Sequence, residues 1–223
     1  MPLTENQVEI LRNALAAYNF PCVLYDFENS YERSHSTMTP VEETIRNDLI
    51  SGNNDRVMNG LSNVLYWGFA QIGYRDTRVN KFRSEVRVEQ LHDAAILFQN
   101  MERIDLMKIK NIKLPQFSGM SFISKVAMFL DPENFVILDK QIVKMNQVQT
   151  PTLLNEIAFG ENETRIRISN NNISVYLNWC QKCLRISQAY FDGLYRAVDI
   201  ERGFFTLIQN GNVDQAAKIL SNA

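Results

Sequence analysis

LPQFSGMSFISKVAMFLDPENFVILD, residues 114–139, is the stretch that decides the fold. Leu114-Pro115 ends a preceding helix, because proline lacks an amide donor and disfavours helical geometry in the residue before it. Ser118-Gly119 opens the next helix, which is apolar except for a single lysine, Lys125. After an Asp-Pro break comes an apolar run that ends in a lone aspartate, Asp139. The stretch therefore predicts two helices joined by a tight turn, followed by a loop and a helix start.

Composition is that of an ordinary globular protein. The chain has 223 residues, of which 45% are hydrophobic and 22% charged, and its net charge is −2. No run of about 18 apolar residues occurs, so we expect no membrane span. The first residues are amphipathic and lack a signal-peptide core, which predicts a cytoplasmic protein. A net negative charge argues against a protein that coats DNA without specificity, since phosphate neutralisation drives such binding.

Helical periodicity dominates the rest of the chain and predicts an all-α fold. We expect eight to ten helices in a single domain, residues 1–223, with two helical lobes and a cleft between them. Nine glycines and six prolines are too few for an all-β chain with many turns. The only strand expected is a short one at TRIRI, residues 164–168, and residues 21–40 should be irregular or partly extended. The predicted helices include 40–49, a helix capped by Asn53 or Asn54 with Ile72 on its core face, 138–148, 152–159, 174–189, 195–208 and 214–220.

The cysteines and histidines give no sign of a metal or a cofactor. Three cysteines cannot form a complete set of disulfides, nor can they supply four ligands to an iron–sulfur cluster. Cys180 and Cys183 lie on a helical pattern, where two structural cysteines are the expected interpretation, and only His35 and His92 could add ligands.

Two segments are basic against the acidic background. One contains Arg75, Arg78, Lys81, Arg83 and Arg87, and the other contains Arg103, Lys108, Lys110, Lys113 and Lys125. Two interpretations are open: the segments are solvated helix faces, or they form a local basic surface that binds phosphates.

A hairpin, a lysine on the helix after it and an aspartate at the next helix start together resemble the helix-hairpin-helix DNA glycosylase superfamily. Within it, the chain is most similar to the 8-oxoguanine DNA glycosylase OGG-like proteins, through Gly119, Ser124-Lys125 and Ile137-Leu138-Asp139. The hairpin would occupy about residues 103–130. The usual hairpin is Leu-Pro-Gly-x-Gly, whereas here Gln116 and Ser118 replace the glycines and a glycine follows at 119. Looser likeness extends to YWGFAQIGYRD and YRAVDIERGFF, so about half the chain is covered.

The resemblance implies a base-excision repair glycosylase, with or without lyase activity, that removes an oxidised purine such as 8-oxoguanine from double-stranded DNA. Lys125 would act as the nucleophile or as a positioning residue, because an ammonium beside an apolar wall has its charged form disfavoured, which favours the nucleophilic amine. Asp139 matches the superfamily's essential aspartate, which stabilises the cationic sugar. The superfamily lysine usually comes two residues after the second hairpin glycine, and counting from Gly119 that position is Ser121. Trp67 is a candidate to stack on an extruded base, and the candidate DNA contacts are Lys113, Gln116, Ser118, Gly119 and Ser121.

Each of these residues also has a purely structural interpretation. Lys125 could be a core-helix lysine whose stem is buried, Asp139 a capping aspartate and Trp67 a core tryptophan. For the whole chain, the alternatives are a non-catalytic helix-hairpin-helix protein that binds nucleic acid and a helical adaptor. The sequence leaves open the base, the oligomeric state and the physiological role.

Overall fold

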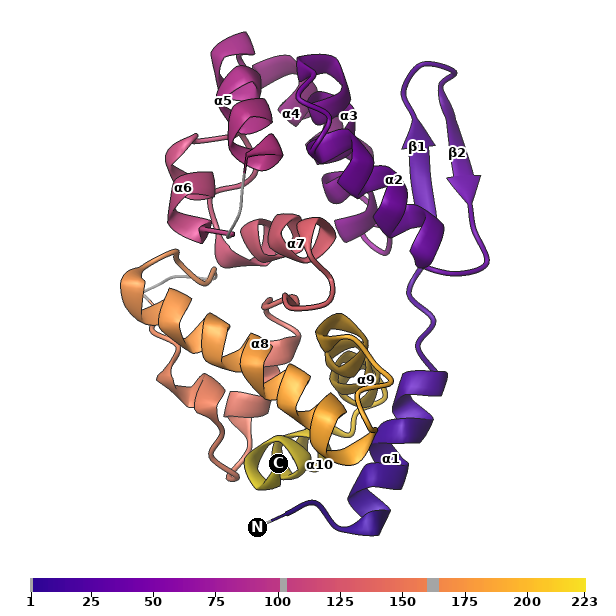
Figure 1. The fold of residues 1–223 in the computed structure, drawn as a ribbon, viewed down its shortest axis with the longest axis vertical. Helices are drawn as coiled ribbons and strands as arrows, with labels where there is room; N and C mark the ends of the chain where they lie inside the picture. The colour runs from indigo at the N-terminus through magenta and orange to yellow at the C-terminus, as the bar shows by residue number, and fades with distance from the viewer. Residues whose placement is uncertain (1, 101–103, 160–164) are drawn as a thin grey trace. The chain divides into compact units, whose positions relative to one another are not determined.

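Helices make up most of the structure, with one two-stranded antiparallel sheet (Figure 1). The computed structural model describes residues 2–100, 104–159 and 165–223. Contacts divide the chain into a central unit, Phe20–Leu130, and a terminal unit made of Met1–Asn19 and Asp131–Ala223. The predicted all-helical character is therefore confirmed, with a small sheet added. None of the described helices is both long and apolar enough to cross a membrane.

The central unit is built on helix α3, which is buried along most of its length. Asn53 caps its start, as the sequence predicts, with its side chain accepting from the amides of Asp55 and Arg56 at 3.0 Å each. Ile72, expected on its core face, lies beyond its end and is 40% exposed. The elements of this unit are β1 (Val23–Asp26), β2 (Tyr31–Ser34), α2 (Thr39–Leu49), α3 (Asn54–Gly68), α4 (Arg75–Glu85), α5 (Val88–Gln99), α6 (Leu106–Asn111) and α7 (Met120–Leu130).

Strands β1 and β2 form a hairpin where the sequence indicated only irregular or partly extended chain. Val23 pairs with Ser34 and Asp26 with Tyr31 in antiparallel register. The side chain of Asn63 in α3 accepts from the Tyr25 amide at 2.8 Å and donates to its carbonyl at 3.2 Å. An amide group thus takes the place of a further strand partner for β1, a long-range contact that local sequence cannot reveal.

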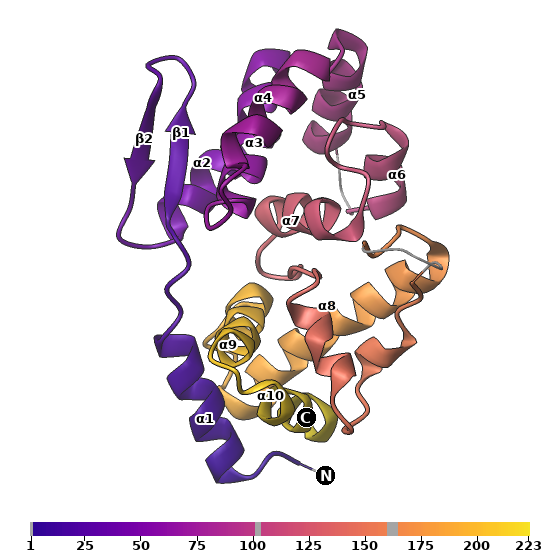
Figure 2. The same cartoon turned by 180° about the vertical axis from the view of Figure 1, so that it is seen from behind.

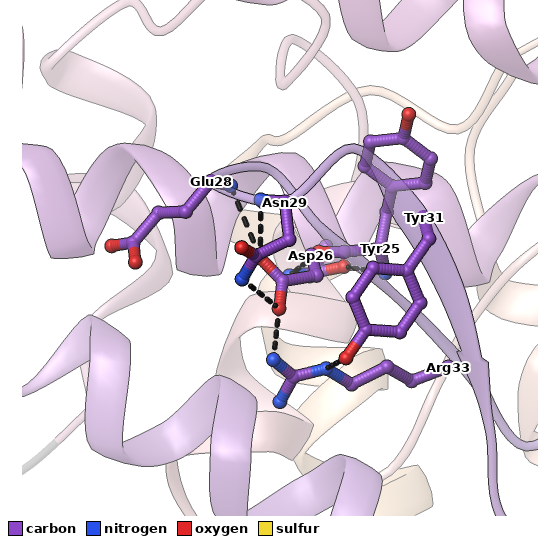
Figure 3. A network of polar contacts seen from close by, with 7 residues as sticks. Tyr25, Asp26, Glu28, Asn29, Tyr31 and Arg33 are labelled. Atoms are coloured by element: carbon purple, nitrogen blue, oxygen red, sulfur yellow. Dashed lines mark hydrogen bonds and ion pairs between the residues drawn. The ribbon is translucent and has the colours of Figure 1, made fainter.

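The hairpin turn is closed by the carboxylate of Asp26 (Figure 3). It accepts hydrogen bonds from the backbone amides of Glu28 and Asn29 at 3.1 and 3.0 Å and from the Asn29 side chain at 3.1 Å. It also pairs with the guanidinium of Arg33. These bonds are those of an Asx turn and fix the hairpin locally.

In the terminal unit, α1 and α9 lie side by side in both views (Figures 1 and 2). A Cβ on Gly203 would lie 2.9 Å from Leu11 Cδ1, so the missing side chain permits this close packing. Thr4 caps α1 in a capping box with Gln7. The elements here are α1 (Glu5–Ala16), the 3-10 helices η1 (Ile142–Gln147) and η2 (Leu153–Glu156), α8 (Asn170–Tyr190), α9 (Ala197–Gln209) and α10 (Val213–Asn222).

Three predicted elements of the terminal unit are wrong in type or extent. The helix expected over 138–148 is only η1, and that over 152–159 is only η2. The irregular run before η1 is bonded to α8: Tyr176 Oη donates to the Val136 carbonyl at 2.9 Å and Trp179 Nε1 to the Ile137 carbonyl at 3.1 Å. Residues 165–168 are not a strand, and residue 164 lies outside the described residues.

Candidate functional site

A buried glutamine ties the turn between α6 and α7, residues 112–119, to helix α5. Gln90 of α5 is buried, and its side-chain amide donates to the carbonyls of Ile112 and Lys113 at 3.1 and 2.6 Å. Helix α6 begins at Leu106, later than the hairpin start expected near residue 103, and Arg103 lies outside the described residues. The expected helix, turn and helix are otherwise present.

Gln116 stands where the superfamily hairpin has its first glycine, and it adopts the backbone conformation that favours glycine. Its φ is +67°, in the left-handed region that residues with a Cβ seldom occupy. Lys113, three residues earlier, has a φ of +58°. The described residues of this turn with a left-handed backbone are Lys113 and Gln116, and Gly119 is not one of them. The turn therefore has a glycine-like shape without a glycine at its tip.

The turn between α6 and α7 has buried apolar residues on one side and polar residues towards solvent on the other. Leu114 and Phe117 are buried, and Phe117 packs edge-on against Phe82 with ring centroids 5.5 Å apart. The residues expected to contact DNA are exposed or half-buried, and all lie in this turn or the first turn of α7: Lys113, Gln116, Ser118, Gly119 and Ser121. The structure thus places the five expected contacts on one short segment, at the start of an eleven-residue helix.

Lys125 is a buried lysine whose amine turns back along α7. Its side chain is 5% exposed. The amine lies 3.3 Å from Ser121 Oγ and 3.4 Å from the Ser121 carbonyl oxygen, one helical turn earlier. It also lies 5.1 Å from the centroid of the Phe122 ring. The amine is therefore positioned at Ser121, next to the hairpin end of the helix.

Gly68, the last residue of α3, makes room for that lysine. A Cβ on Gly68 would lie 3.1 and 3.2 Å from Cδ and Cε of Lys125 and 2.7 Å from Phe122 Cε1. Because such distances are shorter than ordinary van der Waals contact, α3 and α7 can approach this closely only with glycine at position 68.

Trp67 lies within the core of the central unit. It is 2% exposed, and its ring packs against Phe20 and Phe129 with centroids 4.9 and 5.2 Å apart. Its indole N–H meets no acceptor among the described residues. This placement favours the core interpretation of Trp67 over stacking on an extruded base.

Asp139 belongs to the terminal unit, where it caps a turn. Its carboxylate accepts from the backbone amides of Gln141 and Ile142 at 2.9 and 3.3 Å, just before and at the start of η1. The side chain is half-buried. The expected helix-start geometry is present, although the helix is of the 3-10 type. That Asp139 and Lys125 line one cleft stays a prediction, because they belong to different units.

Cys180 and Cys183 are both buried in α8. Burial raises the pKa of the Cys180 thiol to about 12 and that of Cys183 well above its ordinary value. Thiols of this kind are poor nucleophiles at neutral pH, which agrees with the structural interpretation. Among the described residues, no three His, Cys, Asp or Glu side chains are grouped so as to hold a metal ion.

The sequence did not single out a row of arginine–aromatic pairs along α4. The guanidinium carbon of Arg75 lies 3.8 Å from the centroid of the Tyr66 ring. Arg78 lies 5.2 Å from that of Tyr74, and Arg83 lies 4.2 Å from that of Phe27. The arginine spacing was visible in the sequence, but two of the three rings come from other elements, so only the fold reveals the pairs.

Comparison with known proteins found no relative of this chain. No family model matches the chain, and neither the curated proteins nor the solved structures include a match. The likeness to glycosylases accordingly depends on the residues of the hairpin, the lysine and the aspartate themselves.

Proposed function

We propose that the chain is a helix-hairpin-helix DNA glycosylase that releases an oxidised purine from double-stranded DNA. The observation that carries the proposal is the 3.3 Å distance between Lys125 Nζ and Ser121 Oγ. Ser121 occupies the position where the superfamily usually has its lysine, counted from Gly119. Lys125 is four residues later, yet its amine reaches back to that position because residues four apart share a helix face.

Two features of the hairpin add support. Gln116 keeps a φ of +67° at the position of a superfamily glycine, so the turn retains a shape in which backbone amides can face a phosphate. Exposed Lys113 and Ser118 flank it, as expected of a contact that positions DNA without reading its sequence. With a net charge of −2, binding to DNA should be weak and strongly salt-dependent.

In the proposed reaction the amine of Lys125 attacks C1′ of the damaged nucleotide. The bond between C1′ and the base breaks, and the base leaves with one proton of the attacking amine. The C1′–O4′ bond of the sugar ring then breaks, O4′ takes the remaining proton of the nitrogen, and a Schiff base forms between C1′ and the lysine. The carboxylate of Asp139 stabilises the cationic sugar or accepts a proton from the attacking amine. Capping by two backbone amides would hold that carboxylate in place.

Borohydride trapping tests the proposal. Duplexes that each carry one lesion, 8-oxoguanine among them, are incubated with the protein and borohydride, which reduces a Schiff base to a stable covalent complex. We expect a trapped complex for the wild type and none for Lys125→Gln, which removes the amine but keeps much of the stem. Lys108→Gln is the matched control, because it removes one exposed lysine on α6 and should leave the trap intact.

Base release without trapping, surviving in Lys125→Gln, would assign the chemistry to Asp139 and water. Absence of base release from every lesion duplex would overturn the glycosylase proposal.

A second candidate, a non-catalytic helix-hairpin-helix protein, is favoured by one observation. Lys125 is only 5% exposed, as is typical of a lysine whose stem fills a core. In that case Lys125→Gln should leave DNA binding unchanged, and no duplex should lose a base.

A further inference from the structure

A pocket of about 380 Å³ lies within the central unit, between the β1–β2 hairpin and helices α3 and α4. Its volume is within the roughly 300–1,000 Å³ of small-ligand sites. Tyr25, Phe27 and Tyr66 line it together with Asp76, Asn80 and Arg83. Neither Lys125 nor any residue of the turn between α6 and α7 lines this pocket, so it is separate from the residues of the proposed chemistry.

Three aromatic rings, together with Val79, make up the apolar part of the lining. The ring centroid of Tyr25 lies 5.0 Å from that of Phe27 and 5.2 Å from that of Tyr66. Tyr66 is 4% exposed and has the guanidinium of Arg75 over its ring, whereas Tyr25 and Phe27 are half-buried, so a planar heterocycle would stack on Tyr25 and Phe27.

The rings are held in place before any ligand arrives. The backbone of Tyr25 is fixed by both ends of the Asn63 amide, and the turn after Phe27 is closed by Asp26 (Figure 3). Tyr66 donates to a carboxylate oxygen of Glu32 on β2 at 2.6 Å. A preformed site loses little conformational entropy on binding, which favours a genuine ligand site.

Arginines follow the pocket along α4. Arg83 lines it, lies over Phe27, and is held by the side chains of Asn59 and Ser62 at 3.0 and 3.1 Å. Exposed Arg78, on the same helix, donates to the side chain of Gln116 at the hairpin tip at 3.0 Å. Arg78 lies outside the pocket lining, and its contact joins α4 to the turn between α6 and α7.

Acidic groups restrict what this surface can bind. Arg75 is paired with Glu32 at 3.1 Å and with Asp76 at 3.5 Å, so its charge is compensated. Duplex DNA, with its dense charge on both strands, suits such a mixed surface poorly. A single strand carries less charge per length and depends more on stacking.

We propose that this pocket binds one unpaired nucleotide of a nucleic-acid strand, its base against Tyr25 and Phe27 and its phosphate at Arg83. The exposed side-chain amide of Asn80 offers both a donor and an acceptor to the base edge. The inference does not depend on the glycosylase proposal, since it concerns an undamaged single strand and other residues.

Fluorescence anisotropy with labelled oligonucleotides of about ten nucleotides tests it, a length within the range of single-strand sites. The arms are single-stranded DNA, the RNA of the same sequence and the DNA duplex, all undamaged. Binding of either single strand above the duplex supports the proposal, and comparison of the two identifies the source. Single-strand binding no tighter than duplex binding overturns it.

Two variants and one matched control locate the site. Tyr25→Leu keeps an apolar side chain but removes the ring, and should weaken binding by about five- to a hundredfold. Asn80→Asp adds one negative charge inside the pocket and should weaken binding at least about tenfold, because it repels the strand. Lys81→Gln makes the same change in net charge on the same helix, at an exposed residue outside the lining, and should change binding less than about twofold.

Thermal melts accompany the titrations. If Tyr25→Leu fails to fold, Asn80→Asp still decides, because Asn80 is exposed. Equal losses in Asn80→Asp and Lys81→Gln would overturn the proposal, since they would show a diffuse charge effect. Because every strand is undamaged, single-strand binding by a protein that releases no base would refute the glycosylase alone.

Discussion

Gly68 packs directly against the side chain of Lys125: a Cβ on Gly68 would lie 3.1 Å from Cδ of the lysine. The same atom would lie 2.7 Å from Phe122 Cε1, in the ring over which the lysine amine sits. The position of the proposed nucleophile is therefore set by a residue without a side chain, 57 residues earlier in the chain. Gly68 therefore has a packing role of its own, separate from that of the adjacent Trp67.

Gly68→Ala should lower the free energy of unfolding by about 1–3 kcal/mol, the usual cost of overpacking a core. The added methyl must displace Phe122 or the lysine stem, so borohydride trapping should fall as well. Urea unfolding measures the first effect. Gly73→Ala is the control, since nothing lies within 4 Å of its added Cβ, and it should change stability by less than about 1 kcal/mol. Equal effects at the two positions would contradict the packing argument.

Asp139→Asn should separate charge from capping. Asparagine can still accept from the amides of Gln141 and Ile142, so the melting temperature should change little. Loss of the charge should slow base release on the order of a hundredfold or more. Asp139→Ala, in contrast, should lose about 1 kcal/mol of stability together with the cap. Unchanged base release in both variants would remove Asp139 from the proposed chemistry.

Gln116→Gly should be more stable than Gln116→Ala by about 1 kcal/mol, because only glycine occupies a φ of +67° without strain. Both variants lose the hydrogen bond from Arg78, so the difference between them reports the backbone alone. Chemical denaturation of the two variants measures it. Equal stability would mean that the turn relaxes when the side chain is shortened.

Local signals in the sequence predicted the helices and their caps well. The side-chain oxygens of Thr4 and Asn53 accept hydrogen bonds from backbone amides no more than three residues away, so these caps depend only on local sequence. The prediction of a helix over 138–148 was wrong, and the contacts next to this segment are long-range. The carbonyls of Val136 and Ile137, which lead into the helix expected over 138–148, accept from Tyr176 and Trp179, about forty residues away, and periodicity within the segment gives no sign of such contacts.

The candidate site was predictable only in part, for the same physical reason. Lys125 and Asp139 could be selected from their sequence context, and the amine position at Ser121 follows from helical spacing. The aromatic pocket could not be found, because Tyr25 and Tyr66 meet only through the β1–β2 hairpin. That hairpin in turn depends on Asn63, which no local pattern marks as a strand partner.

The hairpin that holds the aromatic pocket should itself be pH-sensitive through Asp26. The backbone and side-chain hydrogen bonds of Asn29, assisted by Arg33, lower the pKa of Asp26 from 3.8 to about 2. A group whose pKa is lower in the folded state stabilises that state above its unfolded pKa. The contribution should be complete above about pH 4 and should disappear as the pH falls towards about 2.

Asp26→Asn tests this directly, since asparagine can keep the turn's acceptor but cannot ionise. The wild type should be more stable than the variant near neutral pH, and the two should converge near about pH 2. Urea unfolding over this range measures the difference. Asp48, whose pKa is raised by burial, and Asp199, whose pKa is lowered chiefly by the Arg196 side chain against the opposing effect of burial, are present in both proteins and cancel. A difference that stays constant across the range would mean that Asp26 stabilises the hairpin by shape and not by charge.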